Sequence, residues 1–211
     1  MSSLSEVYKY HHERTKKTEF SILRKERGKL FSEWIGKGKK VLDIGCRDGT
    51  LTTYFAKNND VLGIDIDPAM LRLAKKRLGI RTKLIDLNED WQLKEKFDVV
   101  VAAEVLEHLY YPDVVCKKIT QVLKPGGLFI GSVPNAYNIK NRIRYIFGIQ
   151  KNTPLEDRTH INQFSYDLLY SMLEKNFRKV YITGMESGSW MELAINFPNL
   201  LSFMLVWKCK K

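Results

Sequence analysis

Three side chains able to bind a metal ion or a proton follow the apolar run at 99–103, namely Glu104, Glu107 and His108. Their i, i+3, i+4 spacing brings them to one face of a helix, if a helix begins near Glu104. Two carboxylates and an imidazole suit Mg²⁺, Mn²⁺ or Zn²⁺, with positions left open for substrate oxygens. His160, within "LEDRTHINQFS", is a candidate fourth ligand. These residue types predict a metal centre or an acid–base centre.

The same residues support two ways of activating an acceptor hydroxyl group. A metal ion lowers the pKa of a hydroxyl that it binds and orients its oxygen. His108 or His160 can instead remove the proton as a general base. Structural interpretations also stay open: Glu104 as a cofactor contact, Glu107 as a solvated helix acid and His108 as a residue bonded to a neighbouring loop.

A second set of candidate residues lies where predicted strands end. In "VLDIGCRDG", Gly45 and Gly49 let the backbone approach a ligand closely, and Asp43 places a carboxylate beside that turn. Asp65 ends the next strand, where an acid accepts both ribose hydroxyls of a nucleoside cofactor. Asp86 ends the third strand and can receive an amino hydrogen of adenine. The pattern G-x-G-x-x-G is absent, which argues against NAD.

These residues are positioned by alternating strands and helices. Predicted strands cover 40–45, 60–66, 81–87, 97–103 and 128–134, and predicted helices cover 4–35, 50–58, 68–79 and most of 106–123. The "KPGG" stretch at 124–127 is expected to be a turn. The alternation predicts one domain with a parallel sheet covered by helices on both faces. Ligands bind such sheets beyond the carboxyl ends of the strands.

The alternation stops after residue 134. A polar and basic insertion, 135–165, is expected to form a lid over the substrate. A helix at 165–177 and strands at 179–185 and 200–207 are predicted to complete the chain.

Apolar residues at helical spacing alternate with basic residues in "NIKNRIRYIFG", 138–148, inside the insertion. Such a helix packs its apolar face on its own domain, the more frequent arrangement, or lies on an anionic bilayer as a peripheral membrane contact. Its polar and aromatic residues Tyr137, Asn138, Asn141 and Tyr145 are candidates to line a substrate pocket.

The composition limits which partners and which compartment the protein is expected to have. The formal net charge of +11 over 211 residues favours anionic partners such as RNA, a membrane surface or a phosphorylated substrate, although solvated lysines also serve solubility alone. No apolar run approaches the roughly 20 residues of a transmembrane helix. The N-terminus lacks the apolar stretch of a secretory signal, so we expect a cytoplasmic protein. Three separated cysteines, Cys46, Cys116 and Cys209, indicate a reducing compartment and no structural zinc site.

Five stretches carry a family resemblance: "VLDIGCRDGTL", "GIDID", "LIDL", "FDVVVAAEVLEHL" and "LKPGGLFI". They resemble the successive motifs of class I S-adenosylmethionine-dependent methyltransferases, across roughly residues 40–135. The resemblance implies a Rossmann-like, doubly wound, mostly parallel seven-stranded sheet with an insertion after strand 5. One departure is Arg47, which replaces the middle glycine of the family's turn.

The resemblance also implies which residues hold S-adenosylmethionine. They are Asp43, Gly45 and Gly49 around the methionine part, Asp65 at the ribose, and Asp86 and Leu87 at the adenine. We also expect Ile66 and Glu104 to contact the cofactor. "EVLEH" followed by "DRTHINQF" resembles the ubiquinone-biosynthesis O-methyltransferases and the small-RNA 2′-O-methyltransferases, in which it supports a divalent metal. The insertion is similar to a broad group, of type 11 and type 23 methyltransferase domains, associated with glycan and lipid modification.

We therefore expect one methyltransferase domain over 1–211 that methylates a hydroxyl oxygen of a small molecule, sugar or lipid-linked precursor. Its expected parts are a helical cap (1–38), a cofactor-binding core (39–134), the lid (135–165) and a C-terminal helix with strands (166–211). In the cap, Tyr8, Tyr10 and His11 are candidates to close over the site, and His11 and His12 are otherwise surface residues. The alternatives are an RNA 2′-O-methyltransferase and a non-catalytic, cofactor-binding activator subunit, the latter indicated only by Arg47.

Overall fold

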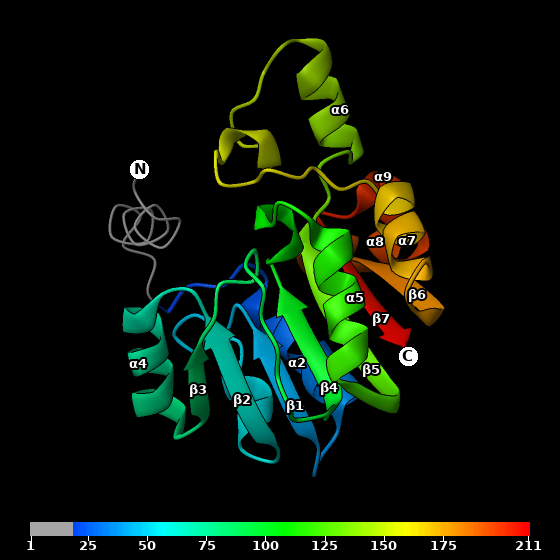
Figure 1. Cartoon of the computed structure of the whole chain (residues 1–211). Coiled ribbons are helices and arrows are strands. Elements are labelled where there is room, and N and C mark those ends of the chain that lie inside the picture. The colour runs from blue at the N-terminus through cyan, green and yellow to red at the C-terminus, as the bar shows by residue number, and fades with distance from the viewer. Residues whose placement is uncertain (1–18) are drawn as a thin grey trace. The chain divides into compact units, whose positions relative to one another are not determined.

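The computed structural model describes residues 19–211 (Figure 1). Tyr8, Tyr10, His11 and His12, with half of the predicted cap, lie outside the described residues. The strands of the described residues form one seven-stranded sheet in the order β3-β2-β1-β4-β5-β7-β6. The chain divides into two compact units, Met1–Val101 and Ala102–Lys211.

The first unit contains a parallel arrangement of strands with helices between them. Its elements are α2 (Arg24–Ile35), β1 (Lys40–Ile44), α3 (Thr53–Ala56), β2 (Asp60–Asp65), α4 (Pro68–Leu78), β3 (Arg81–Leu84) and most of β4 (Phe97–Ala103). β1 pairs with β2, and β2 with β3, both in parallel. β1 and β4 are almost continuously apolar and buried, as strands covered on both faces must be.

Helix α4 begins and ends where the sequence predicts. The Asp67 carboxylate accepts hydrogen bonds from the backbone N–H groups of Ala69 and Met70, and Pro68 occupies the first turn. Gly79 ends the helix in a left-handed conformation, with φ of 66°. The carboxyl end of β2 is thereby followed at once by a rigid helix start.

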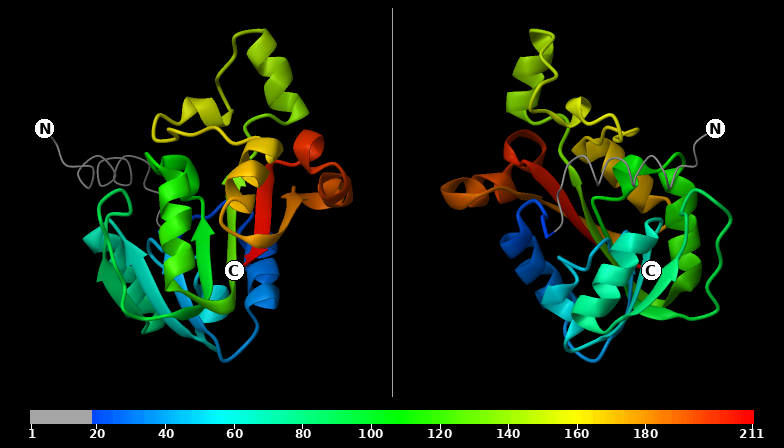
Figure 2. Two further views of the ribbon diagram at one scale, coloured as in Figure 1. Left: turned by 45° about the vertical axis from the view of Figure 1, so that its right-hand side comes forward. Right: turned by 90° about the vertical axis from the view of Figure 1, so that its left-hand side faces the viewer.

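The second unit carries the antiparallel strand and the insertion (Figures 1 and 2). Its elements are η1 (Leu106–His108), α5 (Pro112–Val122), β5 (Leu123–Pro134), α6 (Ile139–Ile146), η2 (Pro154–Glu156), α7 (Tyr166–Glu174), β6 (Arg178–Met185), η3 (Gly188–Trp190), α8 (Met191–Asn196), α9 (Pro198–Leu201) and β7 (Met204–Lys210). β7 lies between β5 and β6 and is antiparallel to both. The prediction of a mostly parallel α/β sheet is confirmed, whereas the single domain with four parts stays a prediction.

Several predicted bounds are wrong for local physical reasons. A helix over 106–123 is interrupted, because Pro112 holds the preceding Tyr111 outside the helical region and starts α5 afresh. "KPGG" is not a turn but the first part of β5. The predicted strand 200–207 begins only at Met204, since Pro198 opens the short helix α9.

Helix α6 does not pack its apolar face on its own domain, although this is the more frequent of the two arrangements that the sequence allows. Its apolar residues do not pack on the domain: Ile143 is 50 % exposed, Ile146 79 % and Phe147, directly after the helix, 74 %. Only Asn141 of α6 is buried. Figures 1 and 2 show α6 standing off from the strands of its own unit. Within the described part of the chain, every helix is too short or too polar to cross a lipid bilayer.

Candidate functional site

The turn after β1 is built on three left-handed residues. Gly45, Arg47 and Gly49 have φ of 67°, 48° and 77°. Arg47 thus adopts a left-handed conformation that glycine adopts without strain. The same conformation costs roughly 1–2 kcal/mol in a residue with a Cβ. Its backbone N–H donates to Asp65 Oδ2 at 2.9 Å. The substitution of the family's glycine therefore leaves the turn in place and tied to the end of β2.

Two carboxylates meet beside this turn within the first unit. Asp43 is 4 % exposed and accepts a hydrogen bond of 2.6 Å from the Thr52 hydroxyl. Burial raises the pKa of Asp43 from 3.8 to about 7; Thr52 acts in the opposite direction, and the charge of Asp65 adds to the rise. Asp65 is buried as well and accepts from the N–H groups of Arg47 and Asp67, each at 2.9 Å.

The other predicted cofactor residues follow the same edge of the strands. Ile66 comes directly after β2, and Asp86 and Leu87 come two and three residues after the end of β3. All three are half-buried. Asp86 accepts a hydrogen bond from the N–H of Asn88, which orients its carboxylate at the start of a turn. Gly49 has a packing role in addition, because a Cβ there would lie 2.7 Å from Leu78 Cδ1.

Glu104 does not begin a helix. Its φ of 57° is left-handed, a conformation that costs of order 1–3 kcal/mol in a residue with a side chain. Its N–H donates to the Ser132 carbonyl at 2.9 Å, and the Ser132 hydroxyl donates to its carboxylate at 3.1 Å. The prediction that one helix face aligns Glu104, Glu107 and His108 is therefore wrong.

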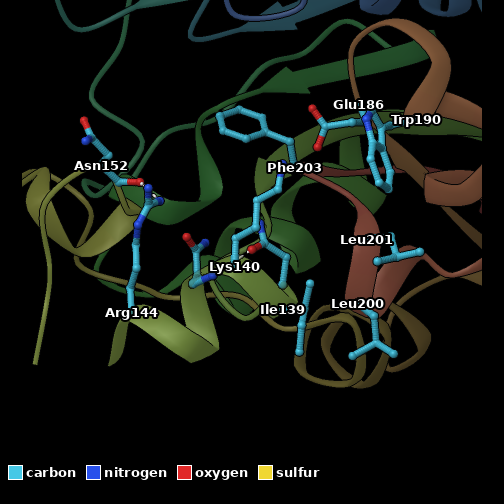
Figure 3. Close-up of a pocket in the computed structure, with 11 residues that line it drawn as sticks. Ile139, Lys140, Arg144, Asn152, Glu186, Trp190, Leu200, Leu201 and Phe203 are labelled. Atoms are coloured by element: carbon cyan, nitrogen blue, oxygen red, sulfur yellow. Dashed lines mark hydrogen bonds between the residues drawn. The ribbon is translucent and has the colours of Figure 1, made fainter. Parts of the chain in front are cut away.

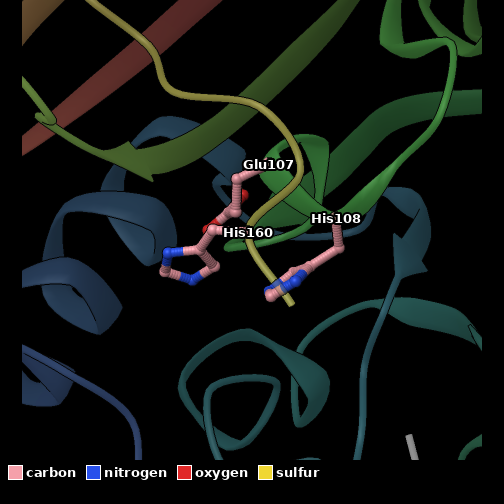
Figure 4. Close-up of side chains that lie close together, drawn as sticks. All are labelled: Glu107, His108 and His160. Atoms are coloured by element: carbon pink, nitrogen blue, oxygen red, sulfur yellow. The ribbon is translucent and has the colours of Figure 1, made fainter. Parts of the chain in front are cut away.

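Glu107, His108 and His160 nevertheless converge, by another route (Figure 4). One ligand atom of each lies within 4.8 Å of those of the other two, and the imidazole centroids are 4.9 Å apart. Glu107 is 1 % exposed, and both histidines are half-buried. Of the four ligands predicted from sequence, Glu104 lies outside this group.

Hydrogen bonds to backbone carbonyls select the tautomer of both neutral imidazoles. His108 Nδ1 lies 2.9 Å from the Thr159 carbonyl, and His160 Nδ1 lies 3.0 Å from the Pro154 carbonyl. Since a carbonyl oxygen only accepts, each Nδ1 carries the hydrogen and each neutral ring keeps its lone pair on Nε2. This is the arrangement of a histidine that binds a metal ion or removes a proton.

The insertion reaches η1 through contacts that no local sequence pattern reveals. Asn162 donates from its backbone to the Glu107 carbonyl at 2.9 Å and from its side chain to the Leu109 carbonyl at 2.5 Å. Asp157 Oδ2 lies 3.9 Å from His160 Nε2, close enough for an ion pair with the protonated imidazole. Asp157, Asn162 and Ser132 are site residues that the sequence analysis missed, and nothing in their spacing indicates them.

The sequence matches the model of a known protein family. The model Methyltransf_23, described as "Methyltransferase domain", covers residues 10–179. The chain belongs to this family of methyltransferase domains. The expectation of a class I S-adenosylmethionine-dependent methyltransferase is thereby confirmed, and with it the cofactor S-adenosylmethionine.

Curated relatives of this methyltransferase domain include two named ubiquinone biosynthesis O-methyltransferase. That of Coxiella burnetii is 31 % identical over 120 residues, which is 54 % of this chain and 51 % of the relative. That of Pasteurella multocida is 36 % identical over 114 residues, 46 % of this chain and 47 % of the relative. The chain spans about half the length of the curated relatives it matches.

Solved structures share the fold of the methyltransferase domain. A SAM-dependent methyltransferase from Archaeoglobus fulgidus superposes with a TM-score of 0.70 at 19 % identity, covering 97 % of this chain and 99 % of that one. The N-methyltransferase NodS from Bradyrhizobium japonicum gives 0.65 at 18 %, covering 92 % and 99 %. At these identities the likeness concerns the fold alone.

Proposed function

We propose that this methyltransferase domain transfers a methyl group from S-adenosylmethionine to a hydroxyl oxygen of a small-molecule, sugar or lipid-linked acceptor. The observation that carries the proposal is the convergence of Glu107, His108 and His160, with the Nδ1 of each imidazole directed at a backbone carbonyl. The names of the curated relatives, which are O-methyltransferases, support the choice of oxygen. We further propose that the insertion 135–165, which supplies His160, acts as the acceptor lid.

The first unit offers residues suited to the cofactor. Two backbone N–H groups orient the Asp65 carboxylate, which leaves it in the fixed position that a ribose requires. Asp43 and Asp65 repel each other, a cost that a cationic ligand offsets. Ile66, Asp86 and Leu87 would contact the adenosine. When bound, S-adenosylmethionine supplies an electrophilic methyl group on a sulfonium.

The histidines would then accept the proton that the acceptor hydroxyl loses. His108 or His160 accepts the hydroxyl hydrogen at Nε2, since each Nδ1 is committed to a carbonyl. The imidazolium that results is stabilised by nearby carboxylates, Glu107 for the group as a whole and Asp157 for His160. The carbonyl contacts keep each ring in the orientation that the transfer needs.

The same three residues also fit a divalent ion. Ligands at about 2.1 Å from a metal lie at most about 4.2 Å from each other, so small side-chain movements from separations within 4.8 Å suffice. Two histidines and one carboxylate form a known ligand set that leaves coordination positions open. In this variant of the proposal, Glu107, His108 and His160 would hold the ion, which would supply the Lewis-acid chemistry that favours loss of a proton from a hydroxyl.

Methyl-labelled cofactor tests the proposed reaction. The protein is incubated with labelled S-adenosylmethionine and separated lipid, small-molecule, RNA and protein fractions of a cell extract, with and without EDTA. Label on oxygen in the lipid or small-molecule fraction is the expected result. Label confined to RNA contradicts it in favour of a 2′-O-methyltransferase, and cofactor binding without transfer to any fraction favours an activator subunit.

The ribose assignment gives a separate prediction. Asp65→Asn should weaken cofactor binding by about 1.5–3 kcal/mol, roughly 10- to 150-fold in Kd, because hydrogen bonds to a carboxylate are lost. Isothermal titration calorimetry with S-adenosylhomocysteine measures the change. Asp60→Asn is the matched control, since this exposed acid begins the same strand at its other end. Equal affinities of both variants would remove Asp65 from the cofactor site.

A further inference from the structure

A cavity of about 410 Å³ lies in the second unit between α6 and the segment containing η3, α8 and α9 (Figure 3). Its lining includes Lys140, Arg144, Glu186, Trp190, Leu200 and Phe203. We propose that this cavity binds the non-reacting part of an amphiphilic, anionic acceptor. A phosphate-like group would contact Lys140 and Arg144, and an alkyl chain would contact Trp190, Leu200 and Phe203. The assignment rests on the proposed function, because it names the class of that function's acceptor.

The basic side chains of the cavity carry charge that neighbouring acids do not neutralise. Lys140 is exposed and makes no ion pair with any residue of 19–211. Arg144 donates to the Asn152 carbonyl at 3.1 Å, a neutral partner that positions the guanidinium and keeps its charge available. The insertion 135–165 holds five lysines and arginines against two acids. An anionic group is therefore favoured here over a neutral one.

Large apolar side chains form the rest of the lining. Trp190 is 58 % exposed, and Leu200 and Phe203 are each 41 % exposed, although all three line a concave surface. When a ligand covers exposed apolar area of this kind, the complex is stabilised by about 25 cal/mol per Å². Glu186, on the same side, is unfavourable for an anion and so restricts the phosphate-like group to the α6 side of the cavity.

The two walls of the cavity are joined by one buried residue, Asn135. Asn135 is 0 % exposed, and its Nδ2 donates to the carbonyls of Pro198 and Asn199, both at 3.1 Å. The backbone carbonyl of Asn135 accepts from Asn141 Nδ2 on α6, also at 3.1 Å. The walls are thus held in place before a ligand arrives, which lowers the entropic cost of binding.

Among anionic ligands, the apolar wall favours a chain-bearing phosphate over a nucleic acid. Trp190 and Phe203 alone would allow base stacking of a polynucleotide. Leu200 adds an aliphatic contact that suits an alkyl chain and not a nucleobase. A bilayer surface would instead contact the exposed residues at the far end of α6, Ile146 and Phe147, which do not line the cavity. These differences make the ligand classes separable by experiment.

Calorimetry with decyl phosphate, below its micellar concentration, tests the proposal on the full chain. We expect it to bind at least tenfold tighter than decyl maltoside, which lacks the charge, and than inorganic phosphate, which lacks the chain. Lys140→Gln should weaken binding about 3- to 10-fold, between the scale of an exposed ion pair and that of a charged hydrogen bond. Glu186→Gln should strengthen it about 2- to 5-fold, and Trp190→Ala should weaken it. Lys117→Gln, an exposed lysine of α5, is the charge-matched control and should change nothing.

Each contrary result has a definite meaning. Equal binding of decyl maltoside, or insensitivity to Lys140→Gln, overturns the anionic site. Loss of binding in Ile146→Ser/Phe147→Ser with no effect of Trp190→Ala moves the contact to a bilayer-facing surface, and displacement by a ten-nucleotide RNA of equal affinity replaces the amphiphile with RNA. Binding needs no turnover, so decyl phosphate bound by a protein that transfers no methyl group refutes the proposed function and the ligand's role as an acceptor, and leaves the cavity as a binding site for anionic amphiphiles.

Discussion

His108→Ala is expected to lower kcat by about 10²–10⁴ while leaving cofactor affinity nearly unchanged. The reason is that proton transfer by a positioned histidine contributes this much to rate, and the contact of His108 Nδ1 with the Thr159 carbonyl holds the imidazole in position. His160→Ala should have an effect of the same order. If the two histidines act as one unit, the double variant should lose little more than either single variant. Steady-state kinetics with the acceptor found by labelling, together with calorimetry, measures both quantities.

Controls for this prediction distinguish a catalytic role of the histidines from a structural one, and a metal-assisted mechanism from general-base catalysis. Arg158→Ala, an exposed residue of the same loop, should retain activity. EDTA that abolishes turnover, with recovery on adding Mg²⁺, Mn²⁺ or Zn²⁺, selects the metal-assisted variant of the mechanism; turnover that survives EDTA selects the general base. A variant that loses cofactor affinity and kcat together would show that these histidines only shape the binding pocket.

Asp43→Asn is expected to change how the free energy of unfolding depends on pH. The pKa of Asp43 is raised from 3.8 to about 7 in the folded state. Between those pH values the folded chain holds a proton that the unfolded chain has released, so this residue makes the protein less stable as pH rises from about 4 to about 7. The full difference corresponds to up to about 4 kcal/mol, at about 1.4 kcal/mol per tenfold step.

The variant should therefore be more stable than the natural protein at pH 8, by about 2–4 kcal/mol, and equally stable near pH 4. Urea unfolding of both proteins without cofactor, at several pH values, measures the difference. Thr52→Val is the companion variant: it removes the hydrogen bond that lowers the pKa of Asp43, so the loss of stability should extend to higher pH. Identical pH profiles for Asp43→Asn and the natural protein would assign the dependence to another group.

The fold followed from the sequence because its signals are local and redundant. β4 has the predicted bounds, Phe97–Ala103, since a short apolar run bounded by polar residues is sufficient for a strand buried on both faces. α4 matches within one residue because Asp67, Pro68 and Gly79 mark both ends. Pro112 is an equally clear local signal, because it separates η1 from α5.

The candidate site was only partly predictable. Strand ends locate Asp43, Asp65 and Asp86 without knowledge of any distant contact. The grouping of His160 with His108 depends on hydrogen bonds between segments about 50 residues apart, which no spacing rule encodes. The helical spacing predicted the right partners for a wrong reason, because Glu104 turns left-handed and a 3₁₀ turn presents the other two residues.

The buried Asn135 amide has a consequence for how acceptor specificity can change. Because this side-chain amide donates to the carbonyls of Pro198 and Asn199, while the backbone carbonyl of Asn135 accepts from Asn141 on α6, the insertion and the C-terminal segment are not interchangeable modules. Grafting residues 135–165 from another methyltransferase would present foreign amides to the old carbonyls and leave buried polar groups unmatched. If the cavity selects the acceptor as proposed, an exchange of acceptor preference requires 186–203 to be transplanted together with the insertion.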